Sequence, residues 1–363
     1  ALMASPESLL QTIAEAEKLV QQTREHDDLA LLQNCYIFLG DTYLDTGDPV
    51  NALKSYGREM ELAERRVADF GGDLSQFSLA ASHSRVAEAL VSRGEINSAL
   101  DHFRQTLALL DQLFPNHQQD TRYPRARMDA LTELGNLYAN PRYPNLGDSR
   151  TGLQYYRAAL AMAEQAVGRD PENALAKRDL ATGHLLVAEI MVGQKPAQAS
   201  QATAHFQQAL AILRSLKERD HKDAQVLRRE ASSLKGLAEA QNLLGDHTSA
   251  LQNLRLALPI SQELLQRDTS NARNLAILHL VLLKLAEVEM QTGDHNAALA
   301  HYREALALSQ TPSAEQSYDL YTCWRLANSY AGLSRYYAMR AMAAPISERP
   351  NLWQEALRYA QQS

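Results

Sequence analysis

The side chains that most often carry out chemistry are scattered through this sequence. There are eleven histidines, and none belongs to a His-Glu-x-x-His motif or to a cluster of cysteine and histidine. Metal sites need such clusters, because several ligands must converge on one ion. His83 and His184 lie inside helical patterns, where packing is the expected role. The sequence therefore predicts no metal site and no cofactor.

One tripeptide, Asp69-Phe70-Gly71, matches the magnesium-binding motif of protein kinases. In a kinase that aspartate works together with a catalytic loop about twenty residues upstream, and the sequence contains no such loop. We expect Phe70 and the glycines after it simply to end a helix. The sequence also has no Gly-x-Ser-x-Gly nucleophile motif and no phosphate-binding loop. We therefore predict that this chain is not an enzyme.

The framework that holds these side chains is predicted to be a repeated helix-turn-helix pattern. In its clearest copy, residues 291–308, Gly293-Asp294 separates two helices, and Ala298, Tyr302 and Ala305 follow on one stripe of the second. Strong helix formers dominate the chain, and no segment alternates with the period of two that a strand requires. These features predict an all-α protein.

The net charge and the length of the apolar runs argue against some kinds of partner. The net charge of -7 argues against nucleic acid, which needs a basic surface. No apolar run reaches about 18 residues, so we predict no membrane insertion by this chain, and its first residues lack the pattern of a signal peptide. The two cysteines, Cys35 and Cys323, both lie in helical patterns, which favours two buried free thiols.

The repeated pattern resembles the tetratricopeptide repeat family. That family has Leu-Gly or Leu-Ala on a first helix, Gly-Asp in the turn, and Ala, an aromatic residue and Ala on a second helix. The first copy here has Leu39-Gly40, Gly47-Asp48, Ala52 and Tyr56. The resemblance implies a right-handed α-solenoid, or superhelix, in which neighbouring units stack to bury their apolar stripes.

The units are longer than the family norm, since the pattern recurs every ~48 residues against about 34. We expect the added length to extend both helices, and Asn173, Asp223 and Asn271 to cap the long first helices. The predicted organisation is a single solenoid over 1–363. It has a leading helix at 5–28, repeat units at 30–75, 76–120, 121–172, 173–222, 223–270 and 271–311, and a degenerate terminal unit at 312–363.

One set of positions is a candidate binding site. In the repeat family, the residue after the small position of the first helix faces the concave groove. In successive units this residue is Asp41, Glu88, Asn136, Glu189, Glu239 and Glu287. Two interpretations stay open. Each carboxylate pairs with an arginine, lysine or tyrosine of a neighbouring unit, or the groove binds a basic or amine-bearing peptide.

A narrower resemblance concerns the joints between units, 169–174, 219–224 and 267–272, and the segment 134–160. They are similar to the C-terminal repeat regions of large serine/threonine protein kinases of bacteria, of the kind abundant in Acidobacteria. This resemblance implies the sensor or docking region of a membrane-anchored signalling kinase, which would lie outside the cytoplasm, in the periplasm.

Two alternatives to that parentage remain. One is a stand-alone cytoplasmic adaptor that binds proteins or peptides. The other is a structural module that forms a homo-oligomer through its C-terminal end. Aromatic residues are dense there, and we expect most of them to fill the core: Tyr318, Tyr321, Trp324, Tyr330, Tyr336, Tyr337 and Trp353.

Overall fold

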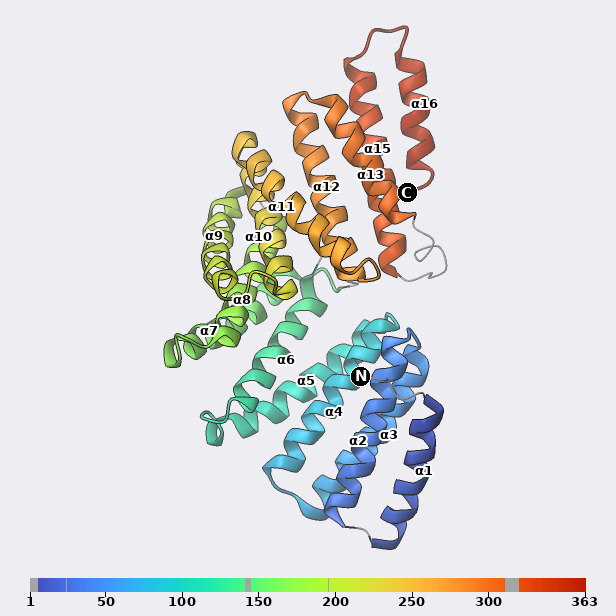
Figure 1. The fold of residues 1–363 in the computed structure, drawn as a ribbon, viewed down its shortest axis with the longest axis vertical. Coiled ribbons are helices and arrows are strands. Elements are labelled where there is room, and N and C mark those ends of the chain that lie inside the picture. The colour runs from blue at the N-terminus through green and yellow to red at the C-terminus, as the bar shows by residue number, and fades with distance from the viewer. Residues whose placement is uncertain (1–5, 24, 141–144, 195, 311–319) are drawn as a thin grey trace. The chain divides into compact units, whose positions relative to one another are not determined.

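The computed structural model describes residues 6–23, 25–140, 145–194, 196–310 and 320–363, and every regular element in these ranges is a helix (Figure 1). The chain divides into two compact units, Ala1–Met162 and Ala163–Ser363, called unit 1 and unit 2 below. The all-α fold is therefore confirmed. A single solenoid with the repeat boundaries given above remains a prediction.

Unit 1 consists of hairpins of antiparallel helices. Its elements are α1 (Pro6–Thr23), α2 (His26–Asp45), α3 (Pro49–Phe70), α4 (Asp73–Ser92), α5 (Ile96–Leu113), a short 3-10 helix η1 (Phe114–Asn116) and α6 (Arg122–Ala139). Helix α7 (Ser149–Arg169) crosses the division between the units. Each helix from α1 to α6 packs against the next along the chain.

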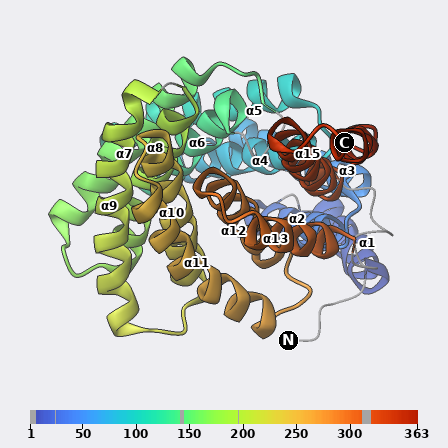
Figure 2. The same ribbon diagram turned by 90° about the horizontal axis from the view of Figure 1, so that it is seen from above.

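Unit 2 repeats this organisation with helices mostly of 20 to 24 residues. Its elements are α8 (Ala174–Gln194), α9 (Pro196–Arg219), α10 (Ala224–Leu243), α11 (His247–Arg267), α12 (Ala272–Thr292), α13 (His295–Ser309), α15 (Leu320–Ala343) and α16 (Arg349–Ala360). The first helices of its hairpins, α8, α10 and α12, lie side by side and form one layer (Figure 2). We call the first helix of each hairpin an A helix and the second a B helix.

Turn chemistry sets where the helices end. Gly47 and Gly293 have φ angles of 77° and 88°, a left-handed conformation that glycine adopts without strain after a helix. Asp48 then caps α3 by accepting from the Asn51 N–H at 3.1 Å. Helix α3 ends at Phe70, and Gly71 has a φ of 64°, so Asp69-Phe70-Gly71 is indeed a helix end.

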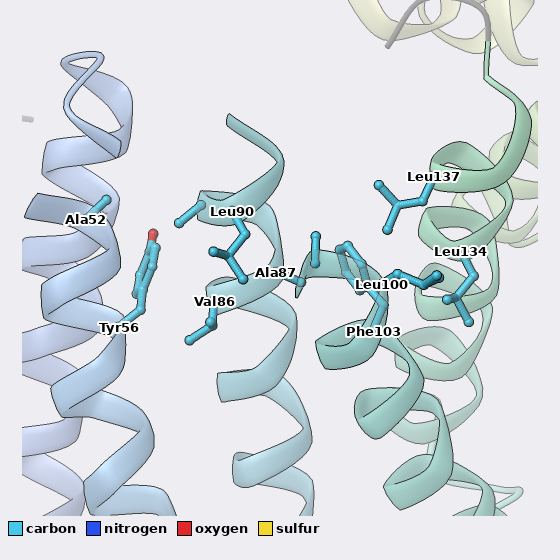
Figure 3. Packing of buried hydrophobic residues seen from close by; sticks show 11 residues of the cluster. Ala52, Tyr56, Val86, Ala87, Leu90, Leu100, Phe103, Leu134 and Leu137 are labelled. Carbon is cyan, nitrogen blue, oxygen red and sulfur yellow. The ribbon is translucent and has the colours of Figure 1, made fainter. Parts of the chain in front are cut away.

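The core runs between successive helices along their small and aromatic positions. Figure 3 shows this row of side chains from α3 through α4 and α5 to α6. Tyr56 is 2% exposed, and its ring lies where a side chain on Gly40 would be, because an added Cβ would come within 2.4 Å of the ring. Tyr156 fills the same place beside Gly135. The small residues therefore let the A and B helices approach closely.

The cysteine prediction was half wrong. Cys35 is a buried free thiol, whereas Cys323 is an exposed one. The buried stripe of α15 runs through Arg325, Ser329 and Leu333, so Cys323 lies off that stripe. Polar residues occupy part of this stripe, so a cysteine in the helix is not necessarily on the buried side.

The C-terminal aromatic residues fill the core only in part. Tyr336 is 6% exposed, and the rings of Tyr337 and Tyr359 stack with their centroids 5.7 Å apart. Trp353 is 45% exposed. Tyr318 and the side chain of Tyr321 lie outside the described residues.

Candidate functional site

The six predicted site residues lie one to an A helix, towards the C-terminal end of each. Each follows a small residue that is buried at the crossing with the B helix, such as Ala87 or Ala238. We call these six positions the ladder. In unit 1 they are Asp41, Glu88 and Asn136, and in unit 2 they are Glu189, Glu239 and Glu287.

In unit 2, two lysines link the three ladder carboxylates. The Lys235 Nζ lies 3.8 Å from a carboxylate oxygen of Glu189 and 3.8 Å from one of Glu239. The Lys284 Nζ lies 2.9 Å from Glu239 and 3.1 Å from Glu287. Opposite charges thus alternate across α8, α10 and α12.

The environment of Lys284 keeps it charged. Burial disfavours the ammonium, but Glu239 and Glu287 outweigh that effect and raise the pKa of Lys284. A cavity of about 40 Å³ beside these three side chains has room for a water molecule and not for a peptide side chain. The ladder of unit 2 is therefore largely satisfied within the chain.

In unit 1, tyrosines of the B helices serve two of the three ladder residues. The Tyr56 hydroxyl donates to the Asp41 carboxylate at 2.6 Å, and the Tyr156 hydroxyl donates to the Asn136 side chain at 2.5 Å. Burial and the Asp41 carboxylate raise the pKa of Tyr56, so this hydroxyl stays protonated. The corresponding aromatic residue in the hairpin of Glu88 is Phe103, which has no hydroxyl to donate.

Glu88 is consequently the exception in the ladder. Within the described ranges, no hydrogen bond or ion pair reaches its carboxylate, although more than a third of the residue is open to solvent. Burial by the surrounding protein and the nearby Glu133 carboxylate raise the pKa of Glu88 to about 7. Asp41 and Asp129 act in the same direction, and Arg85 opposes them.

The nearest cation, Arg85, has another partner. Its Nη1 lies 3.3 Å from the carboxylate of Glu59, which is fully buried. Gln33 and Ser82 also donate to that carboxylate, at 2.6 and 2.7 Å. The positive charge of Arg85 therefore acts on two carboxylates, the buried one of Glu59 and the exposed one of Glu88.

Several of these partners were missed in the sequence. A lysine four residues before Glu239 and one three residues before Glu287 are spacings that place side chains on one helix face, so Lys235 and Lys284 could have been found. Glu59 gave no such signal, because a glutamate on a B helix is normally solvated. Its burial depends on Gln33 and Ser82 from two other helices.

An apolar surface adjoins the ladder in unit 1. Phe38 is 61% exposed and lies on α2 one turn before Asp41. Leu31, two turns further back on that helix, is 50% exposed. The A helices of unit 1 thus offer carboxylates and an exposed aromatic ring together.

The histidines at the core form two equivalent pairs. The Nδ1 atoms of His83 and His102 are 2.9 Å apart, and those of His184 and His205 are 3.0 Å apart. Burial, followed by the partner histidine, lowers the pKa of both His83 and His184 to about 4, so both are neutral at pH 7. Their packing is that expected from the sequence.

The described side chains and helices contain neither a metal site nor a membrane span. No group of three histidine, cysteine, aspartate or glutamate residues there is arranged to hold a metal ion. None of the helices that the structure describes combines the length and apolar character needed to cross a bilayer.

Comparison with known sequences identifies one repeat directly. Residues 280–312 match the model of the tetratricopeptide repeat family. This segment contains Glu287 of the ladder and the Gly293-Asp294 turn. No curated protein matches the sequence.

Comparison with solved structures extends the fold to nearly the whole chain. The apo form of RapI is 14% identical over 98% of this chain and 95% of its own, with a TM-score of 0.57. A Rap protein complexed with competence and sporulation factor is 12% identical over 98% and 96%, with a TM-score of 0.48. A tetratricopeptide repeat protein from Parabacteroides merdae ATCC 43184 is 12% identical over 90% and 98%, with a TM-score of 0.43. The likeness to RapI shows an all-helical solenoid fold of the tetratricopeptide type.

Proposed function

We propose that this chain is a protein- or peptide-binding scaffold and that the A helices of unit 1 bind a basic segment of the partner. The observation that carries this proposal is Glu88, a carboxylate that faces solvent beside Asp41 and Glu133 without a hydrogen-bond donor of its own. At the corresponding places in unit 2, lysines of the chain supply the positive charge.

Unit 2 provides a template for the proposed contact. Lys284 holds its ammonium between the carboxylates of Glu239 and Glu287. A lysine or arginine of the partner takes the same place between Glu88 and a neighbouring carboxylate of unit 1. Phe38 then receives an apolar side chain one helical turn away. The expected ligand alternates basic and apolar residues.

The proposal predicts how binding depends on pH. A cationic ligand binds the ionised carboxylate, and Glu88 ionises near pH 7. Affinity should therefore rise as the pH increases from 6 to 8, and it should fall with added salt. Fluorescence anisotropy of a labelled Lys/Leu peptide over that range measures both effects.

The decisive variant neutralises unit 1 alone. Combining Asp41→Asn, Glu88→Gln and Glu133→Gln should weaken peptide binding by about tenfold or more and remove its dependence on pH. The matched control neutralises Glu189, Glu239 and Glu287 in unit 2, and it should leave binding nearly unchanged. Loss of binding only in the control would place the site in unit 2 and contradict the proposal.

The parent protein is a separate part of the proposal. The likeness of the joints and of segment 134–160 to bacterial kinase repeat regions supports a sensor region of a larger signalling protein, such as a receptor-like serine/threonine kinase. The region would then lie outside the cytoplasm, and a stand-alone cytoplasmic adaptor is the alternative. The reading frame upstream decides between them, since the first requires a kinase domain and an apolar span of about 20 residues.

Self-association is a second candidate function, favoured by the last helical hairpin. Exposed apolar side chains occur on α15, on α16 and in the turn between them, including Met342, Ile346, Trp353 and Leu357. A surface of this kind often mediates association. Light scattering should show a dimer that Ile346→Lys and Leu357→Lys convert to a monomer. A monomer at high concentration would remove this candidate.

A further inference from the structure

A pocket at the other ends of the unit 1 helices carries an inference that does not depend on the ladder. It lies where α2, α4 and α6 begin, beside the joint from α3 to α4 and the joint from α5 to α6. Its volume is about 630 Å³, large enough for a small organic molecule or the end of a peptide. We call it the joint pocket.

Two pairs of rings contribute to the lining of the joint pocket. His26 meets Phe70 edge to face, with ring centroids 5.1 Å apart. His117 stacks on Tyr123 with centroids 4.1 Å apart. Leu74, which also lines the pocket, is 61% exposed. These side chains suit a planar or branched apolar group.

The acidic side chains that line the joint pocket have hydrogen-bond partners within it. The His117 Nε2 lies 2.6 Å from the Asp73 carboxylate. The Nε and Nη2 of Arg122 donate to Asp120 at 3.0 and 2.6 Å. Each acid thus already has a nitrogen partner within the pocket, so neither stands ready for a cation. The Nη1 of Arg122 makes no hydrogen bond to any residue that the structure describes.

The start of α4 also offers backbone N–H donors. The first N–H of α4 that finds a helical acceptor is that of Gln76, which donates to the Gly72 carbonyl at 3.1 Å. The N–H groups of Asp73, Leu74 and Ser75 precede it, and within the described ranges none has an acceptor. The N-cap is Gly72, which has no side chain to accept from them.

At the equivalent joints of unit 2, side chains accept hydrogen bonds from the first N–H groups of the helices. The side chains of Asn173, Asp223 and Asn271 each accept from two N–H groups at the starts of α8, α10 and α12. No side-chain cap of that kind stands at Glu25, Gly72 or Thr121 in unit 1. The starts of α2, α4 and α6 thus lack the side-chain caps that α8, α10 and α12 have, and the start of α4 lies beside the aromatic rings of the joint pocket.

We infer that the joint pocket binds a carboxylate attached to an aromatic or branched apolar group. The carboxylate accepts from the N–H groups of Asp73 and Leu74 and from the Nη1 of Arg122, and the apolar group packs against Phe70 and Leu74. A free organic acid and the C-terminal residue of a peptide share this chemistry.

Calorimetric titration with N-acetyl-L-phenylalanine tests the inference. The acid should bind, whereas N-acetyl-L-phenylalaninamide, which lacks the carboxylate, and N-acetylglycine, which lacks the apolar group, should bind at least about tenfold more weakly. Equal affinity for the acid and its amide would overturn the inference, as would the absence of binding by the acid. A hexapeptide ending in phenylalanine distinguishes the two sources, because tighter binding of the peptide assigns the pocket to a chain terminus.

Two variants place the site. Leu74→Asp introduces a negative charge into the pocket, in the first helical turn where an aspartate is compatible with folding, and Arg122→Gln removes the guanidinium. Each should reduce affinity at least about tenfold without changing the melting temperature by more than a few degrees. The matched control is Leu175→Asp, because Leu175 is the second residue of α8, as Leu74 is of α4, and its N–H donates to Asn173 at 3.0 Å.

The outcomes separate this site from the ladder. Leu175→Asp should leave binding of the acid unchanged, and so should Glu88→Gln, because the ladder lies at the other end of the helices. Unchanged affinity in both Leu74→Asp and Arg122→Gln would place the acid elsewhere and overturn the inference.

Discussion

The A helices of the two compact units are packed in the same way but differ at both ends. In unit 2 they begin with side-chain caps, as at Asn271, and their ladder carboxylates are linked by Lys235 and Lys284. In unit 1 they begin without such caps, and the ladder residue Glu88 has no hydrogen-bond donor among the described residues. One packing pattern can therefore be built with its polar groups either satisfied by the chain itself or left open to solvent.

Substitutions where the A and B helices cross, which is the same in both units, should change stability most. Ala99 in unit 1 and Ala298 in unit 2 are both fully buried at the same place on their B helices. Replacing either by leucine overpacks the crossing, and we expect a loss of about 1–3 kcal/mol in each case. Urea unfolding measures the loss. An unchanged midpoint for only one variant would mean that the cores are not equivalent.

Substitutions of the residue before an A helix should cost stability in unit 2 but hardly in unit 1. Asn271→Ala removes hydrogen bonds to the N–H groups of Arg273 and Asn274, at 3.1 and 3.2 Å, and should cost about 1 kcal/mol. Thr121→Ala at the start of α6 removes no such cap and should cost less than about 0.5 kcal/mol. Thermal denaturation compares them, and equal costs would contradict the difference in capping.

Substitutions in the ladder should give small effects of opposite sign in the two units. The folded-state pKa of Glu88, about 7, lies above the ordinary glutamate value of about 4.3. The folded state therefore holds a proton that the unfolded state has lost, and stability falls as the pH rises from about 4.3 to 7. Glu88→Gln should remove this loss and raise the melting temperature at pH 8 by about 1–2 °C, with no change at pH 4.

The matched variant in unit 2 is Glu239→Gln. It takes a carboxylate away from Lys284 at 2.9 Å and should lower stability at pH 8 by about 1 kcal/mol. Melting curves of both variants at pH 4 and pH 8 make the comparison. Shifts of the same sign at pH 8 would show that the two ladders have the same electrostatic environment.

Much of the fold was predictable, because its determinants are local. The glycine turns, the caps at Asp223 and Asn271 and the stripe of Ala298, Tyr302 and Ala305 depend on residues a few positions apart. The exposure of Cys323 was not predictable in this way, since it follows from the polar stripe on which α15 packs.

The site was predictable in position and not in environment. The spacing placed the ladder residues on the A helices, but the charge around a carboxylate also depends on residues of other helices, such as Lys284 of α12 for Glu239 of α10. Phe103 in place of a tyrosine was the readable signal at Glu88. The joint pocket was missed, because it depends on the absence of a cap and on rings from separate helices.

The arginines at the joints of unit 2 have a mechanical consequence. Arg219 donates to the Glu172 carbonyl of the preceding joint at 3.0 Å, and Arg267 donates to the Lys222 carbonyl at 3.1 Å. Each joint is thereby fastened to the one before it at the edge where the A helices start. These hydrogen bonds oppose the separation of neighbouring joints along that edge of unit 2.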